Sequence, residues 1–302
     1  MDAAVFHEPR RRMIRLADGE MSALDFGDPN RPVDIVFSHA NGFNALTYRS
    51  ILAPLAISLR ILAIDMRGHG SSRLPANPEG RTSWYDLRDD LCGVLDDIGG
   101  PPVILSGHSM GGAASIMAAA QRPARVRALV LFDPVVPDLR TMLHALAPWN
   151  SMERFESAPI ATRAAARRAV FPSAAEALAA YKGRGAFKGW PDTILADYVA
   201  GGFRPRDDGK VELACAPAWE ASNFSSQANN TWGAAGRVKA PITIFRAEHG
   251  STCRIGKGRL FLRAHPKSSV TTVVGASHFL PMERPDLVRD ALLDAAGPSM
   301  VG

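Results

Sequence analysis

Short apolar runs alternate with longer segments of helical periodicity along most of this chain, and that alternation limits the possible folds more than any other feature. The runs contain mainly aliphatic and β-branched residues: 33–38, 61–65, 103–106, 126–132, 242–246 and 270–274. Such runs are typical of strands that are buried on both faces of a parallel sheet. Helical periodicity occurs between and after them, at 47–57, 83–98, 109–121 and 285–296. The alternation predicts an α/β fold with a mostly parallel, doubly wound sheet.

The first part of the chain follows a different pattern. Residues 13–16 and 23–26 form short apolar runs on either side of Asp18-Gly19. An Asp-Gly pair between two such runs is typical of a tight antiparallel turn. We therefore expect a hairpin at the edge of the parallel sheet.

A long segment, residues 137–232, lacks the strand rhythm. It contains helical patches at 162–170 and 174–181, separated by Pro and Gly. Because a loop of this length without structure is rare in a compact domain, we expect a helical insertion. The predicted division is a core of residues 1–136 and 233–302 and a helical cap of residues 137–232.

Composition favours an ordinary globular protein. Hydrophobic residues make up 46% of the 302 residues and charged residues 22%, which is typical of neither disordered nor membrane proteins. No apolar run reaches the ~18 residues of a transmembrane helix, and none follows Arg10-Arg11-Arg12 as in a signal peptide. The three cysteines are widely spaced, without the pairs of a disulfide framework or a zinc site. We expect a cytoplasmic protein without membrane insertion.

The net charge of +5 does not indicate a nucleic-acid partner, because the basic residues are scattered and form no stripe with aromatic residues. No G-x-G-x-x-G turn follows the first parallel strand, which argues against a dinucleotide-binding enzyme. We expect a small-molecule substrate and neither metal nor cofactor. The oligomeric state stays open, a homo-oligomer included.

The most specific motif is Gly107-His108-Ser109-Met110-Gly111, which lies between a predicted strand and a predicted helix. A strand-to-helix turn this sharp forces its central residue into strained backbone geometry, and glycines beside it avoid clashes. The Ser109 hydroxyl then projects above the carboxyl edge of the sheet. This context favours a nucleophile elbow over a Gly-Ser turn without chemistry.

Two further segments complete a site for attack on a carbonyl group. His278 follows the last predicted strand, from where an imidazole reaches back to Ser109 as a general base. The developing oxyanion needs N–H donors, and the backbone N–H of Met110 at the helix start is one. Small residues in His39-Ala40-Asn41-Gly42-Phe43 let another strand end approach Ser109, so we expect the backbone N–H of Asn41 to be the second.

Four motifs resemble the successive landmarks of the α/β-hydrolase family, in family order: Ser38-His39-Ala40-Asn41-Gly42, Asp65-Met66-Arg67-Gly68-His69-Gly70-Ser71-Ser72, Gly107-His108-Ser109-Met110-Gly111 and Gly275-Ala276-Ser277-His278-Phe279. The resemblance covers the core on both sides of the insertion. It implies an α/β-hydrolase fold with a helical cap, and a structural role for His69. We expect the ring of His108 to point away from the nucleophile into supporting structure.

The acid that orients His278 has two candidates. The family usually places an Asp after the strand at 242–246, but the loop there reads Ala247-Glu248-His249-Gly250-Ser251-Thr252. Glu248 lies in this loop, and Asp133 ends the preceding strand. The loop resembles that of some haloalkane dehalogenases, which carry the acid after the earlier strand, and we therefore favour Asp133.

A serine nucleophile limits the types of reaction that the site can catalyse. Dehalogenases and epoxide hydrolases of the family use an Asp nucleophile, whereas a Ser activated by His suits attack on a carbonyl carbon. Carboxylic ester hydrolysis through an acyl-enzyme is the default. The same site also serves lactone, thioester, amide and carbon–carbon bond hydrolysis. A hydrolase fold that acts as a ligand receptor without turnover is the alternative from another class.

The insertion carries large apolar side chains that suit either an acyl pocket or the cap's own core: Met142, Trp149, Met152, Phe155, Phe187, Trp190, Trp219 and Phe224. They favour an apolar substrate of medium size.

Overall fold

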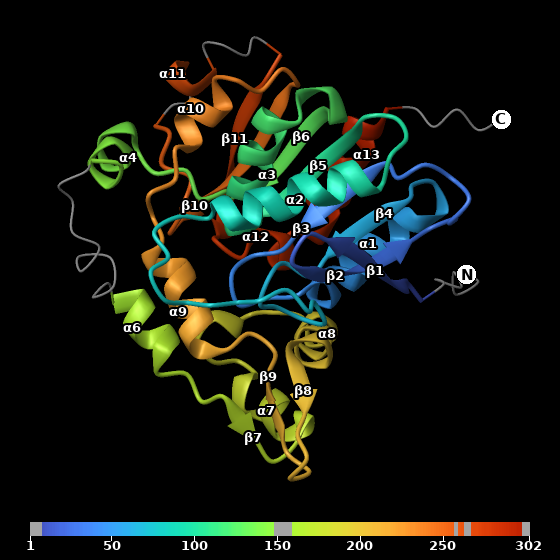
Figure 1. Ribbon diagram of the computed structural model, residues 1–302, viewed down its shortest axis with the longest axis vertical. Helices are drawn as coiled ribbons and strands as arrows, with labels where there is room; N and C mark the ends of the chain where they lie inside the picture. Colours follow the sequence, from blue (N-terminus) through green and yellow to red (C-terminus); the bar gives the residue numbers. More distant parts are fainter. Residues whose placement is uncertain (1–7, 148–158, 257–258, 263–266, 298–302) are drawn as a thin grey trace.

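An eight-stranded sheet forms the centre of the structure (Figure 1). The structure is a computed structural model that describes residues 8–147, 159–256, 259–262 and 267–297. The strands lie in the order β1-β2-β4-β3-β5-β6-β10-β11, and those from β4 to β11 are parallel. Their bounds are β1 (Arg10–Leu16), β2 (Gly19–Phe26), β3 (Ile35–Ser38), β4 (Ile61–Ile64), β5 (Val103–His108), β6 (Val126–Phe132), β10 (Ile242–His249) and β11 (Ser269–Ser277).

The central strands are apolar on both faces because both faces are covered. In β3, Ile35 and Phe37 join one core cluster while Val36 joins the other. Alternate residues of a strand point to opposite faces, so a strand between two cores needs apolar side chains at every position. This is the pattern that predicted the parallel sheet, and the doubly wound, mostly parallel α/β sheet is confirmed.

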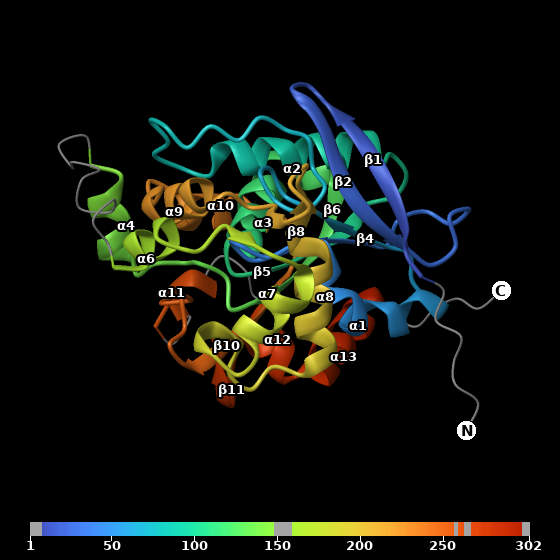
Figure 2. The same cartoon turned by 90° about the horizontal axis from the view of Figure 1, so that it is seen from below.

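Helices cover both faces of the sheet (Figures 1 and 2). On one face lie α2 (Tyr85–Asp97) and α3 (Met110–Gln121), with α10 (Thr231–Ala235) packed on α3. On the other lie α1 (Arg49–Leu52), α12 (Leu280–Glu283) and α13 (Pro285–Ala296). The first two strands form the predicted edge hairpin: β1 pairs with β2 and β2 with β4, both antiparallel.

Between β6 and β10 the elements of the chain are α4 (Leu139–Ala145), α6 (Pro159–Ala165), β7 (Val170–Phe171), α7 (Ala174–Tyr181), η4 (Gly185–Phe187), α8 (Asp192–Gly202), β8 (Phe203–Pro205), β9 (Val211–Leu213), α9 (Pro217–Ser225) and α10. The elements from α6 to α9 form the lower part of the molecule in Figure 1, whereas α4 and α10 lie higher, beside the sheet. The predicted cap limit at residue 232 falls within α10. The division of the chain into domains stays a prediction, and "cap" below means residues 137–232.

The cap is not wholly helical, which corrects the sequence prediction. A three-stranded antiparallel sheet, β7-β9-β8, lies within it. The predicted helix at 162–170 ends at Ala165, and Val170 instead begins β7. Strands of two or three residues are too short to show alternation, so the sequence pattern could not reveal them.

Three other segments complete the element list. The predicted helix at 47–57 is a series of short turns, η1 (Ala45–Tyr48), α1 and η2 (Ala53–Ile57), and a further turn, η3 (Pro123–Arg125), precedes β6. Pro54 lacks an N–H and prevents a continuous α-helix across the first series. Helix α11 (Arg259–Leu262) lies between β10 and β11.

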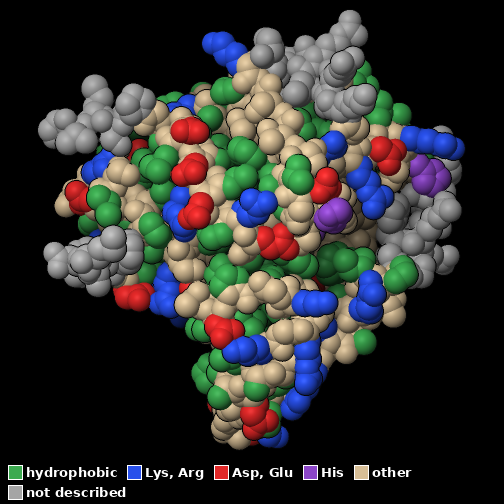
Figure 3. All heavy atoms as spheres, turned by 180° about the vertical axis from the view of Figure 1, so that it is seen from behind, with side chains coloured by type: hydrophobic (Ala, Val, Ile, Leu, Met, Phe, Trp, Pro, Cys, Tyr) green, Lys and Arg blue, Asp and Glu red, His purple; other side chains and the backbone are tan. Residues whose placement is uncertain are grey.

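Basic, acidic and apolar side chains are interspersed over the face opposite to that of Figure 1 (Figure 3). This fits the scattered charge of the sequence. Within the described ranges, no helix combines the length and the apolar character that crossing a bilayer requires.

A buried ion pair joins the loop after β4 to helix α2. Arg67 donates through Nε and Nη2 to the two carboxylate oxygens of Asp90 on α2, at 2.8 and 2.6 Å, and both residues are less than 9% exposed. We expect Asp90→Ala to lower the free energy of unfolding by about 3 kcal/mol, because the buried guanidinium then keeps only the exposed carboxylate of Asp18 as a charged partner. Urea unfolding measures this. The control is Asp89→Ala, whose pair with Arg88 is at the surface and should change stability little.

Candidate active site

Ser109 occupies the turn between β5 and α3 with φ +56°, a left-handed conformation that few L-residues adopt. A Cβ on Gly107 would lie 2.6 Å from the carbonyl carbon of Gly111, and one on Gly111 would overlap the carbonyl oxygens of Ser38 and His39. The start of α3 therefore approaches the neighbouring strand ends at distances that only glycine permits. The strained turn and its small neighbours match the predicted nucleophile elbow.

A series of hydrogen bonds joins Ser109, His278 and Asp133. The Nε2 atom of His278 lies 3.0 Å from Ser109 Oγ, and its Nδ1 atom lies 2.6 Å from Asp133 Oδ2. An ionised carboxylate only accepts hydrogen bonds, so Nδ1 carries the proton and the lone pair of neutral Nε2 faces the serine hydroxyl. This arrangement suits transfer of the hydroxyl proton to the imidazole.

Asp133 is fully buried, and the end of β10 and the loop after it supply its remaining donors. Oδ1 accepts hydrogen bonds from Ala247 N and Ser251 Oγ, and Oδ2 accepts from Thr252 N. Burial raises the pKa of Asp133, but the bonds from His278, Ser251 and Thr252 outweigh this effect and hold the pKa below its ordinary value. The carboxylate stays charged at neutral pH.

Glu248, the other candidate acid, lies elsewhere. Its side chain is 40% exposed, and Oε2 accepts a hydrogen bond from Gly275 N at 2.8 Å. The imidazole of His249 lies 3.5 Å from the Glu248 carboxylate, and the described hydrogen bonds of His278 do not include Glu248. Of the two candidates, the structure brings Asp133 to the imidazole.

Sequence reasoning did not identify Ser251 and Thr252, which appeared only as part of a loop without Asp. Where a relative carries its acid after this strand, the loop must present a carboxylate. Here the same loop presents two hydroxyl groups and backbone N–H donors toward an acid on the neighbouring strand. Hydroxyl residues in place of the expected acid were therefore the available signal.

The predicted oxyanion donors lie on two sides of Ser109. Met110 is the first residue of α3, so its N–H has no acceptor within the helix. In the other loop, Gly42 N donates to His69 Nε2 at 3.0 Å and Phe43 N donates to Ala40 O at 3.1 Å. Among the described residues, no acceptor takes the N–H of Asn41. Neither predicted donor is bound to an acceptor among the described residues, and their role as an oxyanion hole stays a prediction.

Three fully buried histidines hold the loops around the site. His39 Nε2 accepts from Met66 N at 2.9 Å, and His69 Nδ1 donates to Arg67 O at 2.9 Å. His108 Nε2 donates 2.8 Å to the carbonyl oxygen of His278, and its Nδ1 lies 2.8 Å from the Tyr48 hydroxyl. As predicted, His69 is part of a structural turn. The ring of His108 contacts supporting structure and not the Ser109 hydroxyl.

An aromatic cluster adjoins His278. Phe43 packs against Trp190 and Phe279 with ring centroids 5.3 and 6.2 Å apart, and Phe279 lies 5.7 Å from the imidazole. Phe187 packs on Trp190 at 5.1 Å. Two of the cap side chains predicted to line an acyl pocket thus belong to this cluster.

The other predicted cap side chains have different positions. Trp219 faces the loop after β4, where its Nε1 donates to Arg67 O, and Met142 is buried within α4. Phe224 is half-buried on α9. Trp149, Met152 and Phe155 lie outside the described residues.

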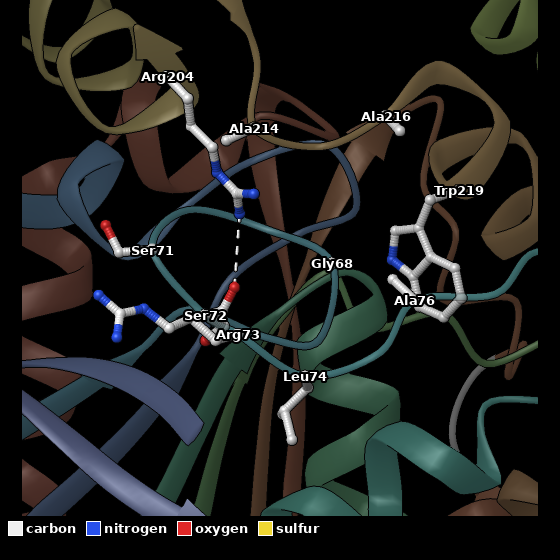
Figure 4. A pocket seen from close by; sticks show the side chains of 10 residues that line it. All are labelled: Gly68, Ser71, Ser72, Arg73, Leu74, Ala76, Arg204, Ala214, Ala216 and Trp219. Atoms are coloured by element: carbon white, nitrogen blue, oxygen red, sulfur yellow. Dashed lines mark hydrogen bonds between the residues drawn. The ribbon is translucent and has the colours of Figure 1, made fainter. Parts of the chain in front are cut away.

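A separate cavity of about 640 Å³ lies between the loop after β4 and the cap (Figure 4). Trp219 bounds one side, and Arg204 extends over it toward the carbonyl oxygen of Ser72. Neither Ser109 nor His278 lines this cavity. Within the described ranges, no cluster of His, Cys, Asp and Glu side chains is arranged to hold a metal ion.

Comparison with known proteins gives a consistent picture. A model described as the alpha/beta hydrolase family matches residues 35–291. The chain is 25% identical to 2-(acetamidomethylene)succinate hydrolase of Mesorhizobium japonicum, over 85% of this chain and 86% of that protein. It is 30% identical to 2-hydroxy-6-oxo-2,4-heptadienoate hydrolase of Pseudomonas putida, over 52% of this chain and 63% of that protein.

Solved structures agree on the fold. The crystal structure of E-2-(acetamidomethylene)succinate hydrolase superimposes with a TM-score of 0.76 at 22% identity, covering 95% of this chain and 98% of that one. The thioesterase domain from the curacin biosynthetic pathway gives a TM-score of 0.73 at 16% identity, covering 94% and 98%. At these identities the superpositions describe the fold alone.

The buried histidines predict how stability depends on pH. Burial lowers the pKa of His39 to about 4, and that of His69 and His108 to about 3. Unfolded chains take up these protons near pH 6.5 while the native protein does not, so stability falls as the pH drops below that value. Between pH 7 and 5 we expect a loss of roughly 1–2 kcal/mol per histidine in urea unfolding.

Replacement of one buried histidine tests the assignment. His39→Gln should reduce the pH dependence by about one proton, whereas His249→Asn, at an exposed position, should leave it unchanged. A free energy of unfolding that stays constant between pH 7 and 5 would contradict the prediction.

Proposed function

Since this chain belongs to the alpha/beta hydrolase family and is a hydrolase, we propose that it cleaves a carboxylic ester or a related acyl substrate through an acyl-enzyme on Ser109. In this proposal His278 is the general base and acid, and Asp133 is the acid of the triad. Glu248 has no part in the chemistry. The backbone N–H groups of Met110 and Asn41 form the oxyanion hole.

One observation supports the proposal most: the unbroken series from Asp133 through His278 to Ser109, at 2.6 and 3.0 Å. Each member has the polarity that nucleophilic catalysis requires. The buried carboxylate fixes the tautomer of the imidazole, and the imidazole presents a lone pair to the hydroxyl. A ligand receptor without turnover has no need for this alignment.

Acylation follows from these positions. The Ser109 oxygen attacks the carbonyl carbon as its proton moves to His278 Nε2, and Asp133 stabilises the imidazolium through Nδ1. The carbonyl oxygen becomes an oxyanion and accepts hydrogen bonds from the Met110 and Asn41 N–H groups. When the tetrahedral intermediate collapses, His278 returns the proton to the leaving alkoxide.

Deacylation uses the same groups. A water molecule gives its proton to His278 Nε2 and attacks the acyl carbon, and the proton then passes to the Ser109 oxygen as the carboxylic acid leaves. Bonds and protons balance over the cycle, so one water molecule is consumed for each ester cleaved.

The aromatic cluster beside His278 supports an apolar acyl or alkyl group in the substrate. Phe279 lies beside the imidazole, and Phe43 and Trp190 pack against Phe279, so apolar ring surface adjoins the base. The names of the relatives include 2-hydroxy-6-oxo-2,4-heptadienoate and 2-(acetamidomethylene)succinate as substrates. Cleavage of a carbon–carbon bond, a lactone or a thioester would use the same site. Of these reactions, ester hydrolysis needs the fewest groups in addition to the triad and the oxyanion donors.

Labelling tests the nucleophile. We expect a fluorophosphonate to form a covalent adduct on Ser109, because its hydroxyl is hydrogen-bonded to the base, and hydrolysis of a p-nitrophenyl ester to fall to background in Ser109→Ala. Peptide mass spectrometry locates the adduct. Attachment at another residue would remove Ser109 from the role, and a stable protein without turnover on a panel of acyl chain lengths would favour the receptor alternative.

Paired substitutions test the acid. We expect Asp133→Asn to lower kcat/KM by at least ~10²-fold, because the wrong tautomer is held and the imidazolium loses its partner. Glu248→Gln should lose less than ~10-fold, since Glu248 accepts from the backbone of β11 and does not contact His278 among the described bonds. Circular dichroism must show that both variants are folded. If the folded Glu248 variant is the inactive one, the acid is not Asp133.

A further inference from the structure

The side chain of Asn41, which carries one of the proposed oxyanion amides, is held by the cap. Its Nδ2 donates to the carbonyl oxygen of Glu220 at 3.0 Å, and its Oδ1 accepts from Nδ2 of Asn223 at 2.9 Å. Glu220 and Asn223 both belong to α9, about 180 residues further along the chain. Both polar ends of the Asn41 side chain are therefore bound to one cap helix.

The orientation of both carboxamides follows from donor and acceptor chemistry. Arg81 Nη1 lies 2.7 Å from the buried side chain of Asn223, and a guanidinium only donates, so it must face Oδ1. The Nδ2 group of Asn223 then faces Asn41, which must present Oδ1 to it. That leaves Nδ2 of Asn41 for the Glu220 carbonyl. The arginine at one end thus fixes the rotamer of Asn41 at the other.

Arg81 is itself fixed. Nε and Nη2 each donate to Asp86 at 2.9 Å, and the guanidinium lies over the Trp219 ring, 3.9 Å from its centroid. Asp86 lies in the first turn of α2. The series Asp86, Arg81, Asn223 and Asn41 therefore connects a core helix to the oxyanion loop through the cap.

The next residue of the loop meets the same helix. Gly42 has φ +74°, and a Cβ there would lie 2.7 Å from Glu220 Oε1. The carboxylate of Glu220 pairs with Arg167, which also donates to the Tyr198 hydroxyl at 3.0 Å. The cap therefore packs directly on the backbone that follows the Asn41 N–H.

We infer that Asn223 of α9 is a positioning residue of the reaction: it holds the side chain of Asn41 and so aims the Asn41 N–H at the oxyanion. The inference rests on the proposed function. Helix α9 then completes the catalytic site in addition to covering it, and any displacement of α9 weakens stabilisation of the transition state.

The test is a double-mutant cycle in the full chain, with hydrolysis of a p-nitrophenyl ester. Asn223→Ala should lower kcat at least ~10-fold and change KM less than ~3-fold, because oxyanion stabilisation acts on the transition state. Asn41→Ala should give a similar loss, since it removes the carboxamide through which Asn223 acts. In the Asn41→Ala background, Asn223→Ala should then cost less than ~3-fold more.

Further variants separate positioning from stability. Asn223→Asp keeps the volume and the Arg81 contact but replaces the donor to Asn41 by an acceptor, so kcat should fall while Tm stays within a few degrees of the wild type. The midpoint of the pH profile should not move, because His278 and Asp133 are untouched. Gln227→Ala is the matched control, because the amide of Gln227 bonds only to Phe224 O of its own segment, and it should keep wild-type kcat.

The outcomes are distinguishable. If the wild-type protein neither labels at Ser109 nor hydrolyses the ester, the proposed function fails, and this inference fails with it. If the wild type is active but the folded Asn223 variants keep its kcat, only the positioning role is wrong. The same holds if the kcat losses of the two alanine substitutions multiply in full in the double variant.

Discussion

A buried carboxylate organises the carboxyl edge of this sheet. Asp133 has no exposed surface, and an ionised group in that position must have its acceptor sites filled from within the protein. The donors come from the end of β10, from the loop after it and from His278 after β11. Two loops that are distant in sequence are therefore held at the end of β6. Release of either loop would leave a charge without partners, which costs several kcal/mol.

Strained backbone conformations also occur at this edge of the sheet. Among the described residues other than glycine, only Ser109 and Asp133 have positive φ, at +56° and +42°. Each such conformation costs on the order of 1–3 kcal/mol and persists only where the surroundings impose it. Hydrogen bonds impose it here: Ser109 N donates to Phe132 O, and Asp133 N donates to Phe245 O. The two strained residues end neighbouring strands and meet the same imidazole.

The sequence predicted what depends on local pattern and missed what depends on distant contacts. The strands at 126–132 and 242–246 and the turn around Ser109 follow from periodicity and glycine spacing, and the structure has them. The cap sheet was missed because its strands have two or three residues. The choice between Asp133 and Glu248 could not be derived from spacing, since it depends on which loop supplies donors. A resemblance between loops favoured Asp133.

The hydrogen bonds of Asn41 illustrate a general property of a series of linked polar side chains. A hydrogen-bond series with an arginine at one end has a direction, because each carboxamide must accept on one side and donate on the other. Exchange of a single member for a residue of opposite polarity reverses the requirement at every later member. Residues 41, 81 and 223 are thus subject to a joint constraint, and we expect related chains to inherit them as a set or to replace them as a set. Divergence of the cap is limited where it meets the core, whatever substrates the rest of the cap comes to accept.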